Sequence, residues 1–163
     1  MEALWAPWRM EFIGKKGESE CIFCTKPRPN DDAVLRENLV LARGQHAFVI
    51  LNKYPYSSGH LLVVPFVHTT SLTQIAGATA TEIHDTIARA VEILGREYRA
   101  EGFNIGVNLG KAGGAGIEGH VHYHVVPRWA GDVNFMPVIA EIKSMPEHLL
   151  ATYDRLHPHF RRK

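Results

Sequence analysis

The stretch that decides the fold is His120-Val121-His122-Tyr123-His124-Val125-Val126, in which histidines alternate with less polar residues. Strict alternation predicts a β-strand, because successive side chains of a strand point to opposite faces of the sheet. The three histidines would then share one face, and the residues between them would pack on the core. A row of imidazoles is costly unless the rings are solvated, hydrogen-bonded or bound to a ligand. The pattern therefore predicts a functional strand.

Apolar runs on both sides of this stretch predict the other elements. Runs of strand length occupy residues 38–43, 47–51, 60–64 and 103–109, in addition to 120–126. Residues 79–101 carry apolar side chains at helical spacing and are followed by Gly102, which predicts one long helix. A last helix is expected over about residues 146–156, with Pro146 in its first turn.

One long helix between two groups of strands predicts an α+β fold. We expect an antiparallel sheet of about five strands, with one long and one C-terminal helix packed on it. A chain of 163 residues is long enough for one domain with its own core. We expect a single domain over residues 1–163, with an N-terminal arm at 1–35 and a catalytic core at 36–163.

Composition excludes several classes of protein. The chain carries 18 Lys and Arg against 17 Asp and Glu, which argues against a nucleic-acid binder that works by bulk charge. No apolar run approaches the ~18 residues of a membrane span, so no membrane partner is expected. The first residues lack the basic and long apolar regions of a secretory signal, which predicts a cytoplasmic protein.

A glycine-rich loop at residues 110–116 lies just upstream of the histidine stretch. The free N–H groups of such loops can form an anion-binding concavity. The chain holds ten histidines, and a neutral imidazole can attack an electrophilic phosphorus near pH 7. The combination favours phosphoryl or nucleotidyl transfer. A metal site is the alternative, since alternating histidines also suit zinc.

Residues 120–126 resemble the signature of the histidine-triad family, His-φ-His-φ-His-φ-φ, where φ is apolar; Tyr123 is more polar than the family pattern. Pro55-Tyr56, followed by residues 59–65, resembles the central hairpin of that family. Residues 4–9 and 127–136 are similar to the bacterial branch that contains diadenosine tetraphosphate phosphorylases. The resemblance covers most of the chain. It implies a homodimer, an adenine nucleotide or dinucleoside polyphosphate as substrate, and no organic cofactor.

The resemblance also implies roles for individual residues. His122 would be the nucleophile that attacks the α-phosphorus, and His124 would contact the phosphate or leaving group. His120 would orient the site or bind metal, and His60 would support the nucleophile through a hydrogen bond. Asn52 falls where the family contacts ribose. The positions where the family contacts phosphates are Asn108, Gly114, Gly116 and Ile117.

The chain departs from many relatives just before the triad. Those relatives place Ser or Thr with Gln there, whereas this chain has Gly116-Ile117-Glu118-Gly119. Phosphate contacts would then come mainly from backbone N–H groups, which is compatible with the phosphorylase branch. The acceptor is left open between inorganic phosphate and water. Hydrolysis of nucleoside phosphoramidates and nucleotide binding without turnover are the alternative functions.

The two cysteines, Cys21 and Cys24, have the spacing of a zinc knuckle. Two thiolates do not complete a structural zinc site, and His68 and His120 are the candidates for the remaining ligands. Several bacterial histidine-triad proteins resemble this arrangement, which implies a structural zinc that holds the N-terminal arm beside the active strand. A reduced thiol pair or a redox pair is the alternative.

Overall fold

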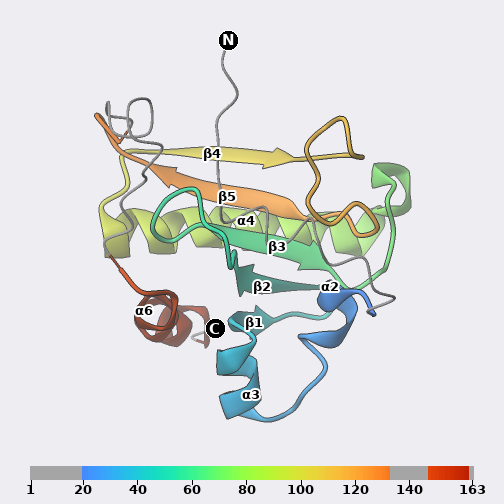
Figure 1. The fold of residues 1–163 in the computed structure, drawn as a ribbon, viewed down its shortest axis with the longest axis horizontal. Helices are drawn as coiled ribbons and strands as arrows, with labels where there is room; N and C mark the ends of the chain where they lie inside the picture. The colour runs from blue at the N-terminus through green and yellow to red at the C-terminus, as the bar shows by residue number, and fades with distance from the viewer. Residues whose placement is uncertain (1–19, 133–146, 162–163) are drawn as a thin grey trace.

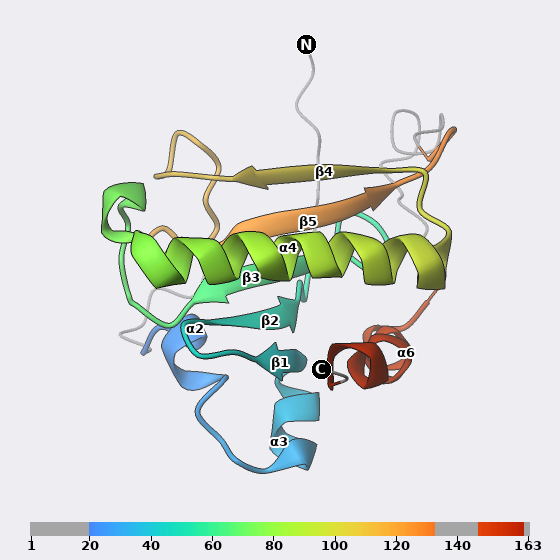
Figure 2. The same cartoon turned by 180° about the vertical axis from the view of Figure 1, so that it is seen from behind.

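In the computed structural model, which describes residues 20–132 and 147–161, five strands form one antiparallel sheet in the order β1-β2-β3-β5-β4 (Figure 1). The longest helix, α4, lies across one face of this sheet (Figure 2). The predicted α+β fold is confirmed. The elements in chain order are α2 (Ile22–Thr25), α3 (Asp32–Glu37), β1 (Val40–Arg43), β2 (Ala47–Leu51), β3 (Leu61–Pro65), η2 (Leu72–Gln74), α4 (Gly77–Tyr98), β4 (Gly102–Val107), β5 (Tyr123–Arg128) and α6 (Leu149–Arg161).

The hairpin of β2 and β3 forms the centre of the core. Every residue of both strands is buried, and their register runs from Ala47 opposite Pro65 to Leu51 opposite Leu61. Helix α4 adds buried apolar side chains at helical spacing, among them Ile83, Ala90 and Leu94. The expected helix at 79–101 is therefore present, but it ends at Tyr98. The next residue, Arg99, takes the left-handed conformation with φ of 49° and stops the helix before Gly102.

The triad strand begins later than predicted, at Tyr123 instead of His120. The expected pairing with β3 stops because Pro65 has no backbone N–H to offer to β5. The amide of its neighbour Phe66 faces the other way and donates to the carbonyl of His46 at 2.8 Å. The N–H of Val121 instead donates to the carbonyl of Thr69 at 2.8 Å. Residues 120–122 therefore approach the sheet as irregular backbone.

The C-terminal helix differs from the expected 146–156. Helix α6 runs through Pro158 to Arg161. The buried side chains of Leu156 and Phe160 hold its last turns on the core, and Arg89 of α4 donates to the carbonyls of His159 and Phe160 at 2.9 Å. Pro146 and residues 4–9 and 133–136 of the earlier predictions lie outside the described residues. Within residues 20–132 and 147–161, no helix has the length and apolar character to cross a membrane.

Glu82 of α4 fastens the start of β2. Its carboxylate accepts hydrogen bonds from the backbone N–H of His46, at 3.0 and 3.1 Å, and of Ala47, at 3.1 Å. A Cβ at Gly44 would lie 1.9 Å from Glu82 Oε1, so only glycine leaves room for this contact. One side chain thus ties the helix to the turn that opens the central hairpin.

Replacing Glu82 with alanine removes the acceptor for these two backbone donors. We expect Glu82→Ala to lower the free energy of unfolding by about 1.5 to 3 kcal/mol, the usual cost for hydrogen bonds to a charged group. Urea denaturation measures the difference. Glu92→Ala, at an exposed site of the same helix, is the control. Equal effects of the two substitutions would contradict the assigned role of Glu82.

Candidate active site and metal centre

Aromatic rings from the hairpin loop and from the triad stand in a row. The rings of His122 and His124 lie 5.0 Å apart between centroids, and the ring of His60 lies 5.2 Å from that of His124. Tyr56 stacks on His60 at 4.8 Å. The His60 and His122 side chains are buried, while Val125, on the other side of β5, lies in the hydrophobic core. The expected alternation is therefore present along the part of the stretch that is a strand.

The hydrogen bond of His122 fixes which of its nitrogens is available. Its Nδ1 lies 2.8 Å from the carbonyl oxygen of His120. A carbonyl can only accept, so Nδ1 carries the hydrogen and Nε2 carries the lone pair. Burial lowers the pKa of His122 below its ordinary value, which keeps the ring neutral at pH 7. A neutral imidazole with a free Nε2 lone pair is the form that acts as a nucleophile.

A second chain of hydrogen bonds fixes His124. The backbone N–H of Tyr56 donates to His60 Nδ1 at 3.0 Å, so the hydrogen of His60 is on Nε2. That Nε2 lies 3.0 Å from His124 Nδ1 and donates to it. The hydrogen of His124 is therefore on its Nε2. The site thus pairs a ring with a free lone pair, His122, with a ring whose Nε2–H can donate, His124.

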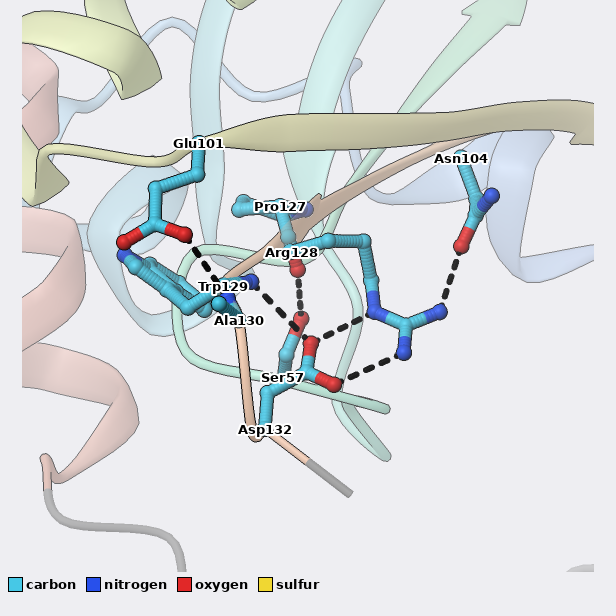
Figure 3. Close-up of polar contacts among 8 residues, drawn as sticks. All are labelled: Ser57, Glu101, Asn104, Pro127, Arg128, Trp129, Ala130 and Asp132. Atoms are coloured by element: carbon cyan, nitrogen blue, oxygen red, sulfur yellow. Dashed lines mark hydrogen bonds and ion pairs between the residues drawn. The ribbon is translucent and has the colours of Figure 1, made fainter.

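Polar contacts at the end of β5 hold the loop that supplies Tyr56 and His60 (Figure 3). Ser57 Oγ of this loop donates to the carbonyl of Pro127 at 2.9 Å. The next residue, Arg128, binds the carboxylate of Asp132 at 2.5 and 2.7 Å and Asn104 Oδ1 at 2.6 Å. The strand end and the loop are thereby fixed to each other.

The turn after β5 is tied down as well. The backbone N–H of Trp129 donates to Asp132 at 3.2 Å, and that of Ala130 donates to Glu101 at 2.8 Å (Figure 3). The indole N–H of Trp129 donates to the carbonyl of Tyr98 at 3.1 Å. These bonds connect the turn to the end of α4 and to the start of β4. They set the position at which β5 leaves the sheet.

The asparagines singled out in the sequence make contacts within the protein. Asn52 Oδ1 accepts from the N–H of Tyr54 at 3.0 Å, and its Nδ2 lies 3.3 Å from His60 Nδ1. The structure thus brings Asn52 to the histidine row. Asn108 Nδ2 donates to the carbonyl of Gly114 at 3.4 Å, within the glycine-rich loop.

The glycine-rich loop connects β4 to the triad. Gly114 has a φ of +81°, a conformation that favours glycine, and Gly116 is exposed. Ile117 packs against the hydrophobic core and anchors the loop just before His120. The loop therefore enters the triad from a fixed point. Its contacts with a substrate remain a prediction.

The four residues predicted to bind metal lie together. One donor atom from each of Cys21, Cys24, His68 and His120 lies within 4.8 Å of the others. His120 Nδ1 is 3.4 Å from Cys21 Sγ and 3.6 Å from Cys24 Sγ, and His68 Nδ1 is 3.3 Å from Cys24 Sγ. Tetrahedral zinc with its usual Zn–S and Zn–N bonds places neighbouring ligand atoms about 3.3 to 3.8 Å apart. The three short separations, from His120 to both sulfurs and from His68 to Cys24, match this geometry.

The chemistry of the donor set also fits a cation. His120 Nε2 lies 2.9 Å from the carbonyl of Pro65 and must donate to it, which leaves the lone pair on Nδ1 beside both sulfurs. Burial and the neighbouring Cys21 raise the pKa of the Cys24 thiol. The Cys24 sulfur becomes a thiolate when a bound metal ion neutralises its charge.

Sequence reasoning missed two residues of this region. Tyr56 supplies the backbone N–H that fixes His60, and Phe23 packs against the rings of His120 and His122. The family resemblance placed Tyr56 in the central hairpin and gave it no role of its own. Phe23 stands between the two cysteines, so a metal site that includes His120 was the signal that could have placed it near the triad.

The fold and the site together define a class of protein: an antiparallel α+β domain with a row of histidines at the start of one strand of its sheet. The family model described as HIT domain matches residues 35–131, and the chain belongs to this histidine-triad family. The chain is 34% identical over 161 residues to the AP-4-A phosphorylase of Mycobacterium tuberculosis. The matched region covers 93% of this chain and 80% of that protein. The expected resemblance to the phosphorylase branch is confirmed.

Two further comparisons find one relative in sequence and one solved structure with the same fold. The chain is 24% identical to a bis(5'-nucleosyl)-tetraphosphatase of Schizosaccharomyces pombe, over 70% of this chain and 63% of that protein. The crystal structure of a zinc-bound histidine triad family protein from Mycobacterium smegmatis shares the fold, with a TM-score of 0.64, 24% identity, and coverage of 88% of this chain and 95% of that one. The phosphorylase and the tetraphosphatase carry names of enzymes, which confirms the prediction of a HIT-family enzyme.

Proposed function

We propose that this protein cleaves dinucleoside polyphosphates, diadenosine tetraphosphate among them, at the α-phosphorus, with inorganic phosphate as the acceptor. The observation that carries the proposal is the pair of assigned tautomers, with a lone pair on His122 Nε2 and a hydrogen on His124 Nε2. The names of the mycobacterial and yeast relatives support the substrate class.

In the first step, His122 Nε2 attacks the α-phosphorus and a P–N bond forms. The bond from phosphorus to the bridging oxygen breaks, and ATP leaves as an anion that accepts a hydrogen bond from His124 Nε2–H. The carbonyl of His120 stabilises the positive charge that develops on the His122 ring, because Nδ1–H already donates to it. AMP remains covalently bound to His122.

In the second step, an unprotonated oxygen of inorganic phosphate attacks the same phosphorus. The P–N bond breaks, its electron pair returns to His122 Nε2, and ADP is released. Backbone N–H groups of the loop that contains Gly114 and Gly116 bind the non-bridging oxygens and the acceptor. Asn52, beside His60, contacts the ribose.

The products formed from diadenosine tetraphosphate, with and without inorganic phosphate, identify the acceptor of the AMP group. We expect ADP plus ATP when phosphate is present and no turnover when it is absent. AMP plus ATP without phosphate would make water the acceptor. If neither pair forms, the dinucleotide substrate is wrong, and an adenosine phosphoramidate becomes the next substrate to test.

The variant His122→Ala tests covalent catalysis, because it removes the proposed nucleophile. We expect turnover to fall by at least about a thousandfold, as for loss of other covalent nucleophiles. His84→Ala is the control, since that ring is exposed on α4. Full turnover by His122→Ala would overturn covalent catalysis.

We propose in addition that Cys21, Cys24, His68 and His120 hold a structural zinc ion. The donor distances, the lone pair of His120 Nδ1 and the zinc-bound mycobacterial structure support this. When bound, zinc would supply charge neutralisation for the two sulfurs and a fixed link between the arm and His120. It would have no open position for substrate, because the protein supplies all four ligands.

Elemental analysis of protein purified without added metal tests the zinc site. We expect about one zinc per protomer, the stoichiometry of a closed four-ligand site, and a loss of most of it in His68→Ala. His84→Ala should keep the wild-type content. A ratio near zero in the wild-type protein would end the proposal.

We also propose a homodimer that forms along β4. Among residues 20–132 and 147–161 this strand pairs with β5 alone, so within that part of the chain its other side is an edge of the sheet. Ile105 and Leu109 are 50% and 45% exposed, and residues 102–110 include no charged side chain. An uncharged apolar edge of this kind pairs readily with a second copy.

Light scattering coupled to gel filtration measures the oligomeric state. We expect a dimer for the wild-type protein and a monomer for Ile105→Lys, since a charge on an edge strand opposes pairing. Val67→Lys, at a similarly exposed apolar residue away from β4, should stay dimeric. A monomeric wild-type protein would contradict the proposal.

A further inference from the structure

Phe23 lies against both histidines at the start of the triad. Its ring centroid is 5.0 Å from that of His122, in a tilted contact, and 5.6 Å from that of His120, in an edge-on contact. The side chain is only 2% exposed. A buried ring that touches the proposed nucleophile limits the positions which that nucleophile can take.

The position of Phe23 is set by the two cysteines around it. They share one helical turn, in which the N–H groups of Cys24 and Thr25 donate to the carbonyl of Cys21 at 2.9 and 3.1 Å. Both sulfurs face the imidazole of His120. Because this turn is attached to His120 at its two ends, the ring between them is held at a fixed distance from the triad.

The hydrogen bond of His122 needs such support. The terminal torsion of a histidine side chain is broad, and its two ring orientations differ little in intrinsic energy. A half-turn about this torsion would put a carbon in place of Nδ1 at the carbonyl of His120 and would redirect Nε2. Packing against the Phe23 ring blocks the intermediate ring positions through which this turn passes, so that of the two remaining orientations the one with the hydrogen bond to His120 is held.

We propose that Phe23 is a positioning residue for the reaction: it holds the His122 ring with Nδ1–H on the His120 carbonyl and Nε2 toward the substrate, and it thereby links the metal centre to the nucleophile. This inference rests on the proposed function for its catalytic consequence. The orientation of His122 itself is independent of the substrate.

Phe48 provides a matched control. Its ring lies against Phe23, with ring centroids 6.5 Å apart, and stacks on Phe66 at 5.4 Å. It is as deeply buried as Phe23, and its ring contacts are with other phenylalanines. A general loosening of this part of the core would follow from Phe48→Leu as well as from Phe23→Leu, whereas misplacement of His122 would follow only from Phe23→Leu.

The kinetic test compares the two variants with diadenosine tetraphosphate. We expect Phe23→Leu to lower kcat by about tenfold to a hundredfold, the effect of a slightly misplaced reacting group, while KM changes by less than about threefold. Phe48→Leu should keep kcat within about threefold of the wild-type value. Zinc content and the melting temperature are measured on the same samples. Equal kcat values for the two variants would overturn the proposal.

A spectroscopic readout separates this proposal from the proposed function. The ¹⁵N shifts of the histidine rings report which nitrogen carries the hydrogen, whether or not the protein turns over a substrate. We expect His122 to be a single Nδ1–H tautomer in the wild-type protein and in Phe48→Leu, and a mixture in Phe23→Leu. An unchanged His122 tautomer in Phe23→Leu would overturn the positioning role even if diadenosine tetraphosphate is cleaved.

A second variant covers the case in which Phe23→Leu does not fold. Phe23→Met nearly conserves the volume but replaces the flat ring with a flexible chain. We expect it to fold, to keep its zinc, and to show the same mixture of His122 tautomers. If it keeps the single tautomer and the wild-type kcat, the flat ring has no positioning role and the proposal fails.

Discussion

The hydrogen bond between His122 Nδ1 and the carbonyl of His120 determines which nitrogen of the central histidine carries the lone pair. Both ring nitrogens of His120 make further contacts. Its Nε2–H donates to the carbonyl of Pro65, and its Nδ1 faces the sulfurs of Cys21 and Cys24. One residue therefore joins the proposed nucleophile, the end of the sheet and the proposed metal ligands.

This arrangement depends on the sheet ending early. In an unbroken ladder, alternate carbonyls of a strand are taken by backbone N–H groups of its neighbour. Pro65 has no N–H to continue the ladder, so residues 120–122 leave the strand geometry. The carbonyls of Pro65 and His120 are then available to imidazoles. The proline that ends the pairing thus leaves its own carbonyl for His120 Nε2, and the irregular backbone that follows lets the His120 carbonyl accept from His122 Nδ1.

Much of this site could be predicted from the sequence, because the signals were local. The periodicity located the five strands of the described residues, β2 with its observed bounds. The spacing of Cys21 and Cys24 indicated a possible zinc site, and the resemblance to histidine-triad proteins supported His68 and His120 as its other ligands. The errors arose where a distant residue decides the outcome. The start of β5 depends on the neighbouring strand, and the length of α6 depends on Arg89 and on burial of its last turns.

The two halves of the reaction centre have separate supports, which meet between His122 and His124. The hairpin loop, tied to β5 by Ser57, fixes His124 through His60. The other support comes from α2, whose Phe23 packs on His122. In the proposed reaction, nucleophilic attack and departure of the leaving group occur at opposite sides of one phosphorus, so both rings must be oriented at once. Since the supports come from segments far apart in the chain, the site is complete only when the arm and the hairpin are both packed on the sheet.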